Sequence, residues 1–157
     1  MFSKSCEYGI RAVIIICENS KQGLVINVKE ICSETNVPEQ YLAKILQKLS
    51  RKKVISSIKG PKGGFFLDKQ QQKLKLIDLV QAIDGDELFV GCGLGLQECS
   101  EITPCPLHKY IKTIRHDLKY MLQITTIGKL AKDVKKQLLR EMRMSSTEKE
   151  ILPKGTN

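Results

Sequence analysis

The amino-acid sequence predicts a mostly α-helical protein with one small β-hairpin and a long helix towards its C-terminal end. Apolar residues recur at helical spacing in several segments, and two β-prone runs flank a connection rich in glycine and proline at residues 54–68. A narrow apolar stripe follows residue 106. No apolar run approaches the ~20 residues that a membrane span needs, and no secretory signal is evident. We therefore expect a cytoplasmic protein without a membrane partner.

The first three helices follow from capping signals as well as from apolar spacing. The first helix is expected over residues 3–19. Asn27 is a suitable N-cap for a second helix, and Glu30, three residues later, completes a capping box. Pro38 ends that helix because proline disfavours helical geometry at the preceding residue, and a third helix begins at Glu39. Two short helices joined by a tight turn have the outline of a helix-turn-helix.

A β-hairpin and a short helix complete the predicted first domain. The runs VISSI at 54–58 and FFLD at 65–68 are β-prone, and the sequence KGPKGG between them predicts a hairpin. A hairpin that directly follows a helix-turn-helix is the wing of a winged helix-turn-helix domain. Apolar residues 76–83 then predict a short helix, which Asp84 and Gly85 end.

The distribution of charge predicts that this domain binds double-stranded DNA. The net charge is +9, and residues 44–75 hold ten lysine or arginine residues against one acid. Basic side chains gain affinity by neutralising phosphates, and glutamine pairs with adenine. The alternatives are a merely solvated basic face and a simple tight turn at the paired glycines. The predicted DNA contacts are Gln40, Tyr41, Lys44, Gln47, Lys48 and Arg51 in the third helix, and Lys59, Pro61, Lys62, Gly63 and Gly64 in the hairpin.

The stretch GCGLGLQECSEITPCPLHKYI, at residues 91–111, concentrates three thiols and one imidazole. Six residues separate Cys92 from Cys99, five separate Cys99 from Cys105, and His108 lies three positions after Cys105. Three soft thiolates suit zinc, copper(I) or an iron–sulfur cluster, and His108 would complete the Cys3His set of a closed zinc site. Free cysteines, with or without a reversible disulfide, are the remaining alternative. Cys17 and Cys32 lie on apolar helix faces and are expected in the core.

A long helix is predicted directly after these cysteines. Pro104 and Pro106 suit its first turn, which Thr103 is expected to cap. Cys105 and His108 would then share a face of that turn. The apolar residues of the helix form a narrow, heptad-like seam, which favours a dimerisation helix over a helix lying on its own domain. They are Leu107, Ile111, Ile114, Leu118 and Met121.

The chain resembles a known family over roughly residues 1–140. Three segments and the cysteines after them carry the resemblance: SKSCEYGIRAV, VKEICSETNVPEQYLAKILQKLSRKKVISSIKGPKGGFFL and KLIDLVQAIDG. They are similar to segments of the Rrf-type bacterial winged-helix transcription factors. The resemblance implies a homodimer on a partly palindromic operator, with the recognition helix in the major groove and the wing in the minor groove. It also implies an iron–sulfur cluster on Cys92, Cys99 and Cys105.

The resemblance suggests two residues as the fourth ligand. His108 matches the IscR-like pattern, which accompanies a [2Fe–2S] cluster, and we predict this ligand and this cluster in preference to [4Fe–4S]. Glu7 stands where NsrR-like members place an acid that reaches the cluster from the other subunit; otherwise we expect it to pair with Arg11. The interval of six residues between the first two cysteines departs from the five of IscR-like members.

These features together predict four parts: a DNA-binding domain over residues 1–86, a cluster-binding loop over 87–105, dimerisation and C-terminal helices over 106–144, and a disordered tail over 145–157. We expect a transcriptional repressor whose operator affinity depends on the cluster and which senses iron–sulfur status, redox state or nitric oxide. The alternative is a winged-helix regulator without iron, using the cysteines as a zinc site or thiol switch. An enzyme is not expected, because no nucleophile–base pair, carboxylate pair or phosphate loop is evident.

Overall fold

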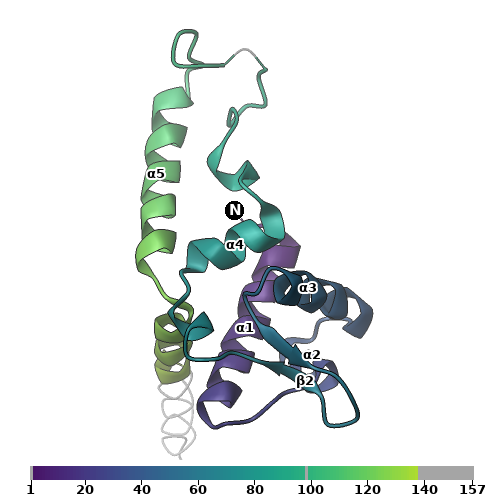
Figure 1. The fold of residues 1–157 in the computed structure, drawn as a ribbon. Helices are drawn as coiled ribbons and strands as arrows, with labels where there is room; N and C mark the ends of the chain where they lie inside the picture. Colours follow the sequence, from purple (N-terminus) through teal and green to yellow (C-terminus); the bar gives the residue numbers. More distant parts are fainter. Residues whose placement is uncertain (1, 98, 138–157) are drawn as a thin grey trace, which may run out of the picture.

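The computed structural model describes residues 2–97 and 99–137, and it has the predicted mostly α-helical fold with one hairpin (Figure 1). The winged domain contains α1 (Lys4–Lys21), α2 (Val28–Thr35), α3 (Glu39–Arg51), β1 (Ser56–Ile58), β2 (Gly64–Phe66), the 3-10 turn η1 (Gln71–Lys73) and α4 (Leu76–Asp84). It is followed by the 3-10 turn η2 (Glu87–Phe89), the cysteine loop (residues 90–107), α5 (His108–Ile124) and helical residues 127–137. The predicted tail over 145–157 lies outside the described residues.

Caps define the ends of the first helices. Ser3 begins α1, and its hydroxyl accepts a hydrogen bond from the Cys6 N–H at 3.0 Å. The predicted capping box of α2 is confirmed: Asn27 Oδ1 accepts from the Glu30 N–H at 3.0 Å, and Glu30 Oε2 accepts from the Asn27 N–H at 2.8 Å. Asn36 ends α2 with a φ of 55°, in the left-handed region that asparagine tolerates.

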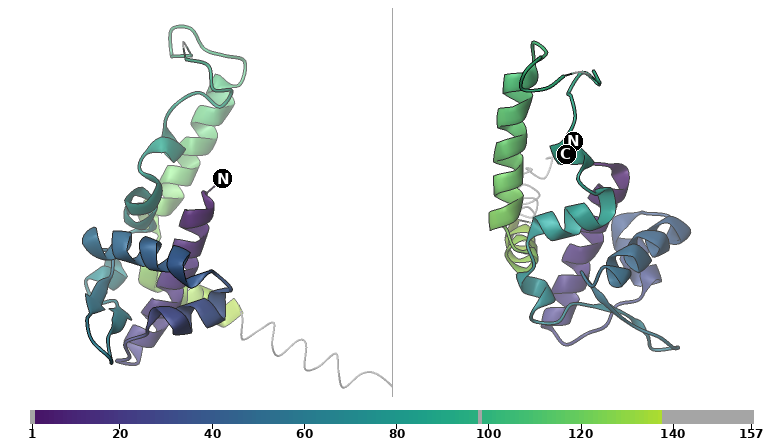
Figure 2. Two further views of the ribbon diagram at one scale, coloured as in Figure 1. Left: turned by 90° about the vertical axis from the view of Figure 1, so that its right-hand side faces the viewer. Right: turned by 45° about the horizontal axis from the view of Figure 1, so that its top comes forward.

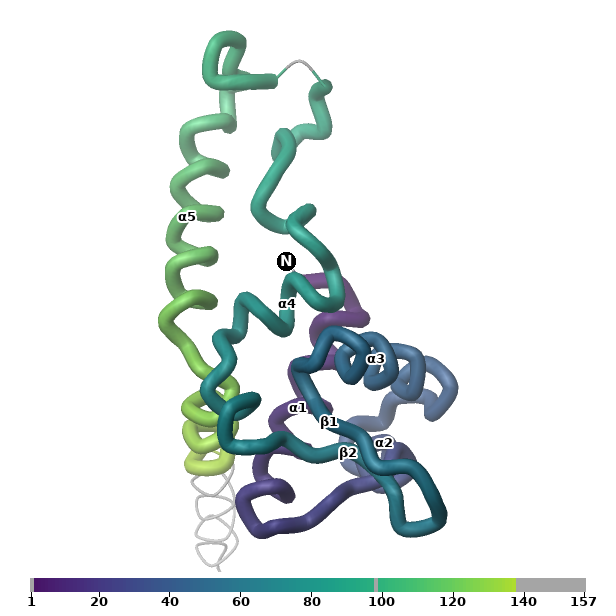
Figure 3. The backbone as a smooth tube through the Cα atoms, viewed as in Figure 1, coloured from purple at the N-terminus to yellow at the C-terminus, as the bar shows by residue number. Residues whose placement is uncertain are grey.

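The core of the winged domain lies between α1, α3 and α4. In α3 the buried residues recur at helical spacing, and each fully buried leucine contributes about 1.5–3 kcal/mol. They are Leu42, Ile45, Leu46 and Leu49. The backbone runs from α3 almost directly into β1, and the hairpin extends from the same side of the domain as α3 (Figure 3). The C-terminal part of the polar face of α3, with Gln47, Ser50 and Arg51, therefore lies beside the hairpin.

The base of the hairpin is fixed by a nearly buried glutamine. Gln71 is 9% exposed, and its side-chain oxygen accepts hydrogen bonds from the Ser56 hydroxyl at 3.1 Å and the Asp68 N–H at 3.0 Å. Its amide nitrogen donates to the Lys53 carbonyl at 3.1 Å. One side chain thus joins both ends of the hairpin to η1, and this polar group has its hydrogen bonds satisfied inside the protein.

The helix α5 extends away from the winged domain and carries the cysteine loop at its far end, opposite the hairpin (Figure 2). Leu122 is fully buried, and Leu118 packs against the same core. Other apolar residues of the helix remain open, with exposed fractions of 68% for Tyr110 and 55% for Ile114. Within the described residues, no helix is long and apolar enough to cross a membrane.

The start of α5 differs from the sequence prediction. The helix begins at His108, after Leu107, and no side chain caps it. Pro104 and Pro106 are therefore not in its first turn, and Thr103 is not its cap. Each proline disfavours helical geometry at the residue before it, so Cys105 cannot easily enter the helix.

Candidate functional site

The three loop cysteines converge at the far end of α5. The Sγ atoms of Cys92, Cys99 and Cys105 lie within 4.8 Å of one another, and those of Cys92 and Cys105 are 3.6 Å apart. Backbone N–H groups also point at sulfur: Leu94 donates to Cys92 Sγ and Cys105 donates to Cys99 Sγ, both at 3.4 Å. The fold therefore brings together the three thiols that the sequence spacing singled out.

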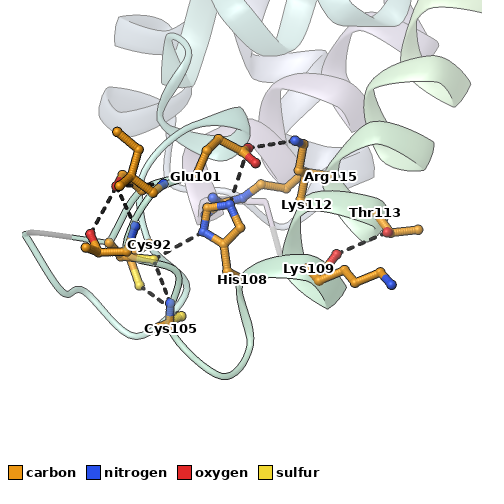
Figure 4. Close-up of polar contacts among 12 residues, drawn as sticks. Cys92, Glu101, Cys105, His108, Lys109, Lys112, Thr113 and Arg115 are labelled. Carbon is orange, nitrogen blue, oxygen red and sulfur yellow. Dashed lines mark hydrogen bonds and ion pairs between the residues drawn. The ribbon is translucent and has the colours of Figure 1, made fainter.

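His108 stands beside these sulfurs as the first residue of α5. Its Nδ1 lies 3.2 Å from Cys99 Sγ, and its Nε2 lies 3.4 Å from Glu101 Oε1 (Figure 4). Lys112 donates to the same Glu101 oxygen at 2.6 Å. Cys105 and His108 do not share a helix face; instead the His108 N–H donates to the Cys105 carbonyl at 3.0 Å in a turn. The turn still places both side chains at one site.

The loop gives its thiols unequal acidity. The N–H groups of Leu94 and Leu96 stabilise the thiolate and lower the pKa of Cys92 to about 7. The Cys105 N–H has the same effect on Cys99, but burial and the neighbouring thiols Cys105 and Cys92 outweigh it, so the pKa of Cys99 is raised. Of Cys92 and Cys99, Cys92 is therefore the thiol that is more readily deprotonated for binding a metal.

The donor set fits a thiolate-ligated metal centre. Three sulfurs within one short distance of each other, with an imidazole nitrogen beside them, suit zinc or an iron–sulfur cluster, because both prefer soft thiolate ligands. The remaining cysteines lie elsewhere. Cys6 and Cys17 are fully buried in the winged domain, and Cys32 packs partly against the same core, as predicted for Cys17 and Cys32. Burial, with a smaller effect of Asp84, raises the pKa of Cys6 to about 12.

Glu7 lies in the first turn of α1 and pairs with a lysine. The Lys4 ammonium contacts its carboxylate at 2.8 Å, and this hydrogen bond lowers the pKa of Glu7. The expected ion pair with Arg11 is not the one that forms. The role of Glu7 as a ligand across a dimer stays a prediction.

The polar face of α3 and the hairpin enclose a groove of about 600 Å³. Predicted DNA-contacting residues from both elements line it: Gln47, Arg51, Lys59, Gly63 and Gly64. Gln40, Pro61 and Lys62 are exposed outside its walls. The predicted contacts in the groove and those exposed outside it both come from α3 and the hairpin, and their contact with DNA stays a prediction.

Three other predicted residues of α3 line a different cavity, of about 720 Å³, beside the start of α1 and the end of α4: Tyr41, Lys44 and Lys48. Two of them have partners within the chain. The Tyr41 and Ser5 hydroxyls are 2.6 Å apart, and Lys48 Nζ donates to the Ile83 carbonyl at 2.6 Å. The helical spacing of the sequence does separate the two sets, because residues 41, 44 and 48 follow one edge of the polar face of α3 and residues 47 and 51 follow the other.

The paired glycines of the hairpin have an internal structural role. A Cβ atom at Gly63 would collide with the Ile58 carbonyl, and one at Gly64 would collide with the backbone of Ile26. Ile26 pairs with Phe65 as an isolated bridge beside the hairpin. The turn interpretation of these glycines is thus supported, and their close backbone contacts lie within the protein.

The winged helix-turn-helix, its basic α3 and its separate cysteine centre define a DNA-binding regulator of transcription. The sequence profile of the Rrf2 family, described as "Iron-dependent Transcriptional regulator", matches residues 2–133. The chain belongs to the Rrf2 family, which confirms the resemblance noted in the sequence.

Individual relatives agree with this assignment. An HTH-type transcriptional regulator assigned to Aquifex aeolicus (strain VF5) is 29% identical over 140 residues, covering 88% of this chain and 96% of the relative. IscR of Klebsiella pneumoniae is 24% identical over 123 residues, covering 78% of this chain and 74% of the relative. The structure of CymR, the global cysteine regulator of B. subtilis, aligns with a TM-score of 0.66 at 24% identity over 84% of this chain and 96% of that one. These relatives are regulators rather than enzymes, as predicted.

Proposed function

We propose that this protein is a homodimeric transcriptional repressor whose affinity for its operator is controlled by an iron–sulfur cluster. Cys92, Cys99 and Cys105 would hold the cluster, with His108 as fourth ligand and [2Fe–2S] as its form. The convergence of the three sulfurs within 4.8 Å, beside the His108 imidazole, carries this proposal. The bound cluster supplies a centre that responds to iron–sulfur status, redox state or nitric oxide. We expect the protein to act in the cytoplasm.

The exposed apolar face of α5 supports a second copy as partner. Leu107, Tyr110, Ile114 and Met121 expose between 41% and 68% of their surface, whereas a soluble helix normally buries such a stripe. Pairing through α5 would set the spacing of two α3 helices, and two half-sites must be met about one helical turn apart.

The cysteine loop is connected to α3 through the end of α4. Only seven residues separate Asp84, at the end of α4, from Cys92. The Arg115 guanidinium donates to the Gly91 carbonyl at the start of the loop, and Lys48 of α3 donates to the Ile83 carbonyl at the end of α4. A changed loop conformation therefore acts on the helix end that Lys48 contacts. A difference of ~1.4 kcal/mol between two states changes operator affinity tenfold.

Anaerobic purification tests the proposed cluster. The absorption spectrum should show a brown chromophore, and chemical analysis should find matching iron and acid-labile sulfide. A colourless protein that anaerobic reconstitution cannot restore would contradict the cluster while leaving the DNA-binding half of the proposal in place.

DNA binding is tested with a duplex that the protein selects from a random library. Lys62→Ala removes an exposed charge at the tip of the wing, so it should weaken binding and reduce the salt dependence by about one phosphate contact. Lys129→Ala, an exposed lysine after α5, is the matched control. If both variants bind the duplex with equal affinity at every salt concentration, Lys62 at the tip of the wing does not contact DNA.

A regulator without iron is the second candidate, and one contact favours it. The Sγ atoms of Cys92 and Cys105 are 3.6 Å apart, close enough for oxidation to a disulfide after a small movement. Cys3His ligation of zinc uses the same residues. Zinc analysis and the response of DNA binding to a dithiol reductant distinguish these two forms from the iron–sulfur form.

A further inference from the structure

The orientation of the His108 ring is fixed from the side away from the sulfurs. Its Nδ1 lies 3.2 Å from Cys99 Sγ, whereas its Nε2 lies 3.4 Å from the carboxylate of Glu101. A carboxylate can only accept a hydrogen bond, so in the neutral ring this contact favours the tautomer with its proton on Nε2, which leaves the Nδ1 lone pair directed at Cys99 Sγ.

Glu101 is itself held by two independent features. Lys112, one turn after His108 on α5, donates to the same carboxylate oxygen at 2.6 Å. The backbone around Glu101 forms a tight turn, in which the Ser100 hydroxyl accepts from the Thr103 N–H at 3.1 Å and the Ser100 N–H donates to the Thr103 carbonyl at 3.2 Å. Figure 4 shows the Glu101 carboxylate between the His108 ring and the Lys112 ammonium.

We propose that Glu101 is a positioning residue of the metal centre, held by Lys112, which makes Nδ1 of His108 the atom that binds metal. The inference rests on the proposed function and deepens it. A carboxylate behind a ligating histidine fixes its tautomer and increases its basicity, and loss of such a partner typically weakens metal binding about 10- to 100-fold. Negative charge behind the ligand also favours the oxidised form of a cluster, so its removal should raise the midpoint potential.

The chain contains a matched control for this carboxylate. Asp117 lies 3.4 Å from the Nδ1 of His116 on the same helix, and both side chains are exposed. Asp117→Asn therefore removes a similar carboxylate–histidine contact two turns further along α5, at a histidine without a hydrogen bond to a sulfur among the described residues. Glu101→Ala removes both the charge and the acceptor, Glu101→Gln keeps an acceptor without charge, and Lys112→Met releases the carboxylate.

Two measurements on the full-length protein test the proposal without any cluster. Nitrogen NMR of the apo-protein should show His108 with its proton on Nε2, and Glu101→Ala should give a mixture of tautomers. Titration with cobalt(II), a probe for zinc-type ligation, should show about 10- to 100-fold weaker binding for Glu101→Ala. Glu101→Gln and Lys112→Met should lie between that variant and the wild type, and Asp117→Asn should match the wild type.

The reconstituted protein gives the third measurement. Glu101→Gln should raise the midpoint potential of the cluster, whereas Asp117→Asn should leave it unchanged. If the wild type assembles no cluster, the proposed iron–sulfur function fails, and the apo-protein and cobalt results still decide the role of Glu101. The positioning role would be overturned if Glu101→Ala and Asp117→Asn showed the same His108 tautomer and the same cobalt affinity. Circular dichroism must show that the Glu101→Ala protein is folded.

Discussion

The winged domain and the cysteine loop are held together in opposite ways. The domain buries a continuous apolar core and adds an internally satisfied glutamine, Gln71. The loop exposes apolar side chains, including Ile102 at 92%, and is held by contacts among its thiols and polar groups. The domain has the core to fold without a ligand, whereas the loop has no apolar core of its own among the described residues, and we expect its conformation to respond to what its sulfurs bind. A regulator built this way can change its sensor without unfolding its DNA-binding surface.

The largest effect is expected at the proposed metal centre, with little change in the stability of the winged domain. Cys99→Ala removes a sulfur that lies beside both His108 and Cys105, so iron and sulfide should be lost completely. The free energy of unfolding should change by less than about 0.5 kcal/mol, as for surface substitutions. Iron and sulfide analysis with urea unfolding of the apo-protein checks both. Unchanged iron content would show that Cys99 is not a ligand, and an unfolded domain would show that the two regions are not separate.

Cysteine alkylation compares the two regions directly in the reduced, metal-free protein. With a pKa of about 7, Cys92 is roughly half thiolate at neutral pH, whereas the buried Cys6, with a pKa of about 12, is almost entirely protonated. Peptide mapping after iodoacetamide treatment should find Cys92 modified first. Its rate should rise as pH increases through 7 and then level off. In urea, which unfolds the protein, the two thiols should react at similar rates. Equal rates in the folded protein would contradict the predicted difference in acidity between Cys92 and Cys6.

A core substitution should lower the stability of the winged domain and leave the cysteine loop unchanged. Leu46 is fully buried in α3, and Leu46→Ala should destabilise the domain by about 2–5 kcal/mol through lost burial and a residual cavity. The alkylation rate of Cys92 should stay at the wild-type value at temperatures where the variant is folded. Urea unfolding and the alkylation assay on one preparation check both. A faster Cys92 would indicate that the loop depends on the core.

A smaller effect is expected at the base of the wing. Gln71→Ala leaves the Lys53 carbonyl and the Asp68 N–H without their side-chain partner, which should cost about 1–3 kcal/mol. Gln72→Ala, at the adjacent half-buried glutamine, is the control and should cost less. Equal losses in urea unfolding would show that the Gln71 hydrogen bonds add nothing specific.

The sequence allowed accurate prediction of those features that depend on residues close to one another along the chain. The capping box joins Asn27 and Glu30, which are three positions apart, and the apolar spacing of α3 identified its buried face. The convergence of the three cysteines was also predicted, because they lie in one short loop. Such features need only local geometry.

Long-range contacts could not be predicted in this way. Lys48 meets the Ile83 carbonyl because α4 ends beside α3, and only the packing of the two helices shows this. Glu101 was missed for a related reason: its contact with His108 depends on how the loop turns. The i,i+4 spacing of His108 and Lys112 was the one available signal, since an acid could bridge these two side chains on one helix face.

The two glycines beside the tip of the wing have a consequence for how such a hairpin can change. Gly63 and Gly64 face the protein's own backbone at Ile58 and Ile26, so they set the shape of the hairpin, whereas Lys59 and Lys62 at its tip are exposed. Substitutions at the tip can therefore accumulate without altering the frame that presents it. With the tip contacting the operator as proposed, changes at Lys59 and Lys62 would alter operator preference while the glycine pair keeps the hairpin geometry constant.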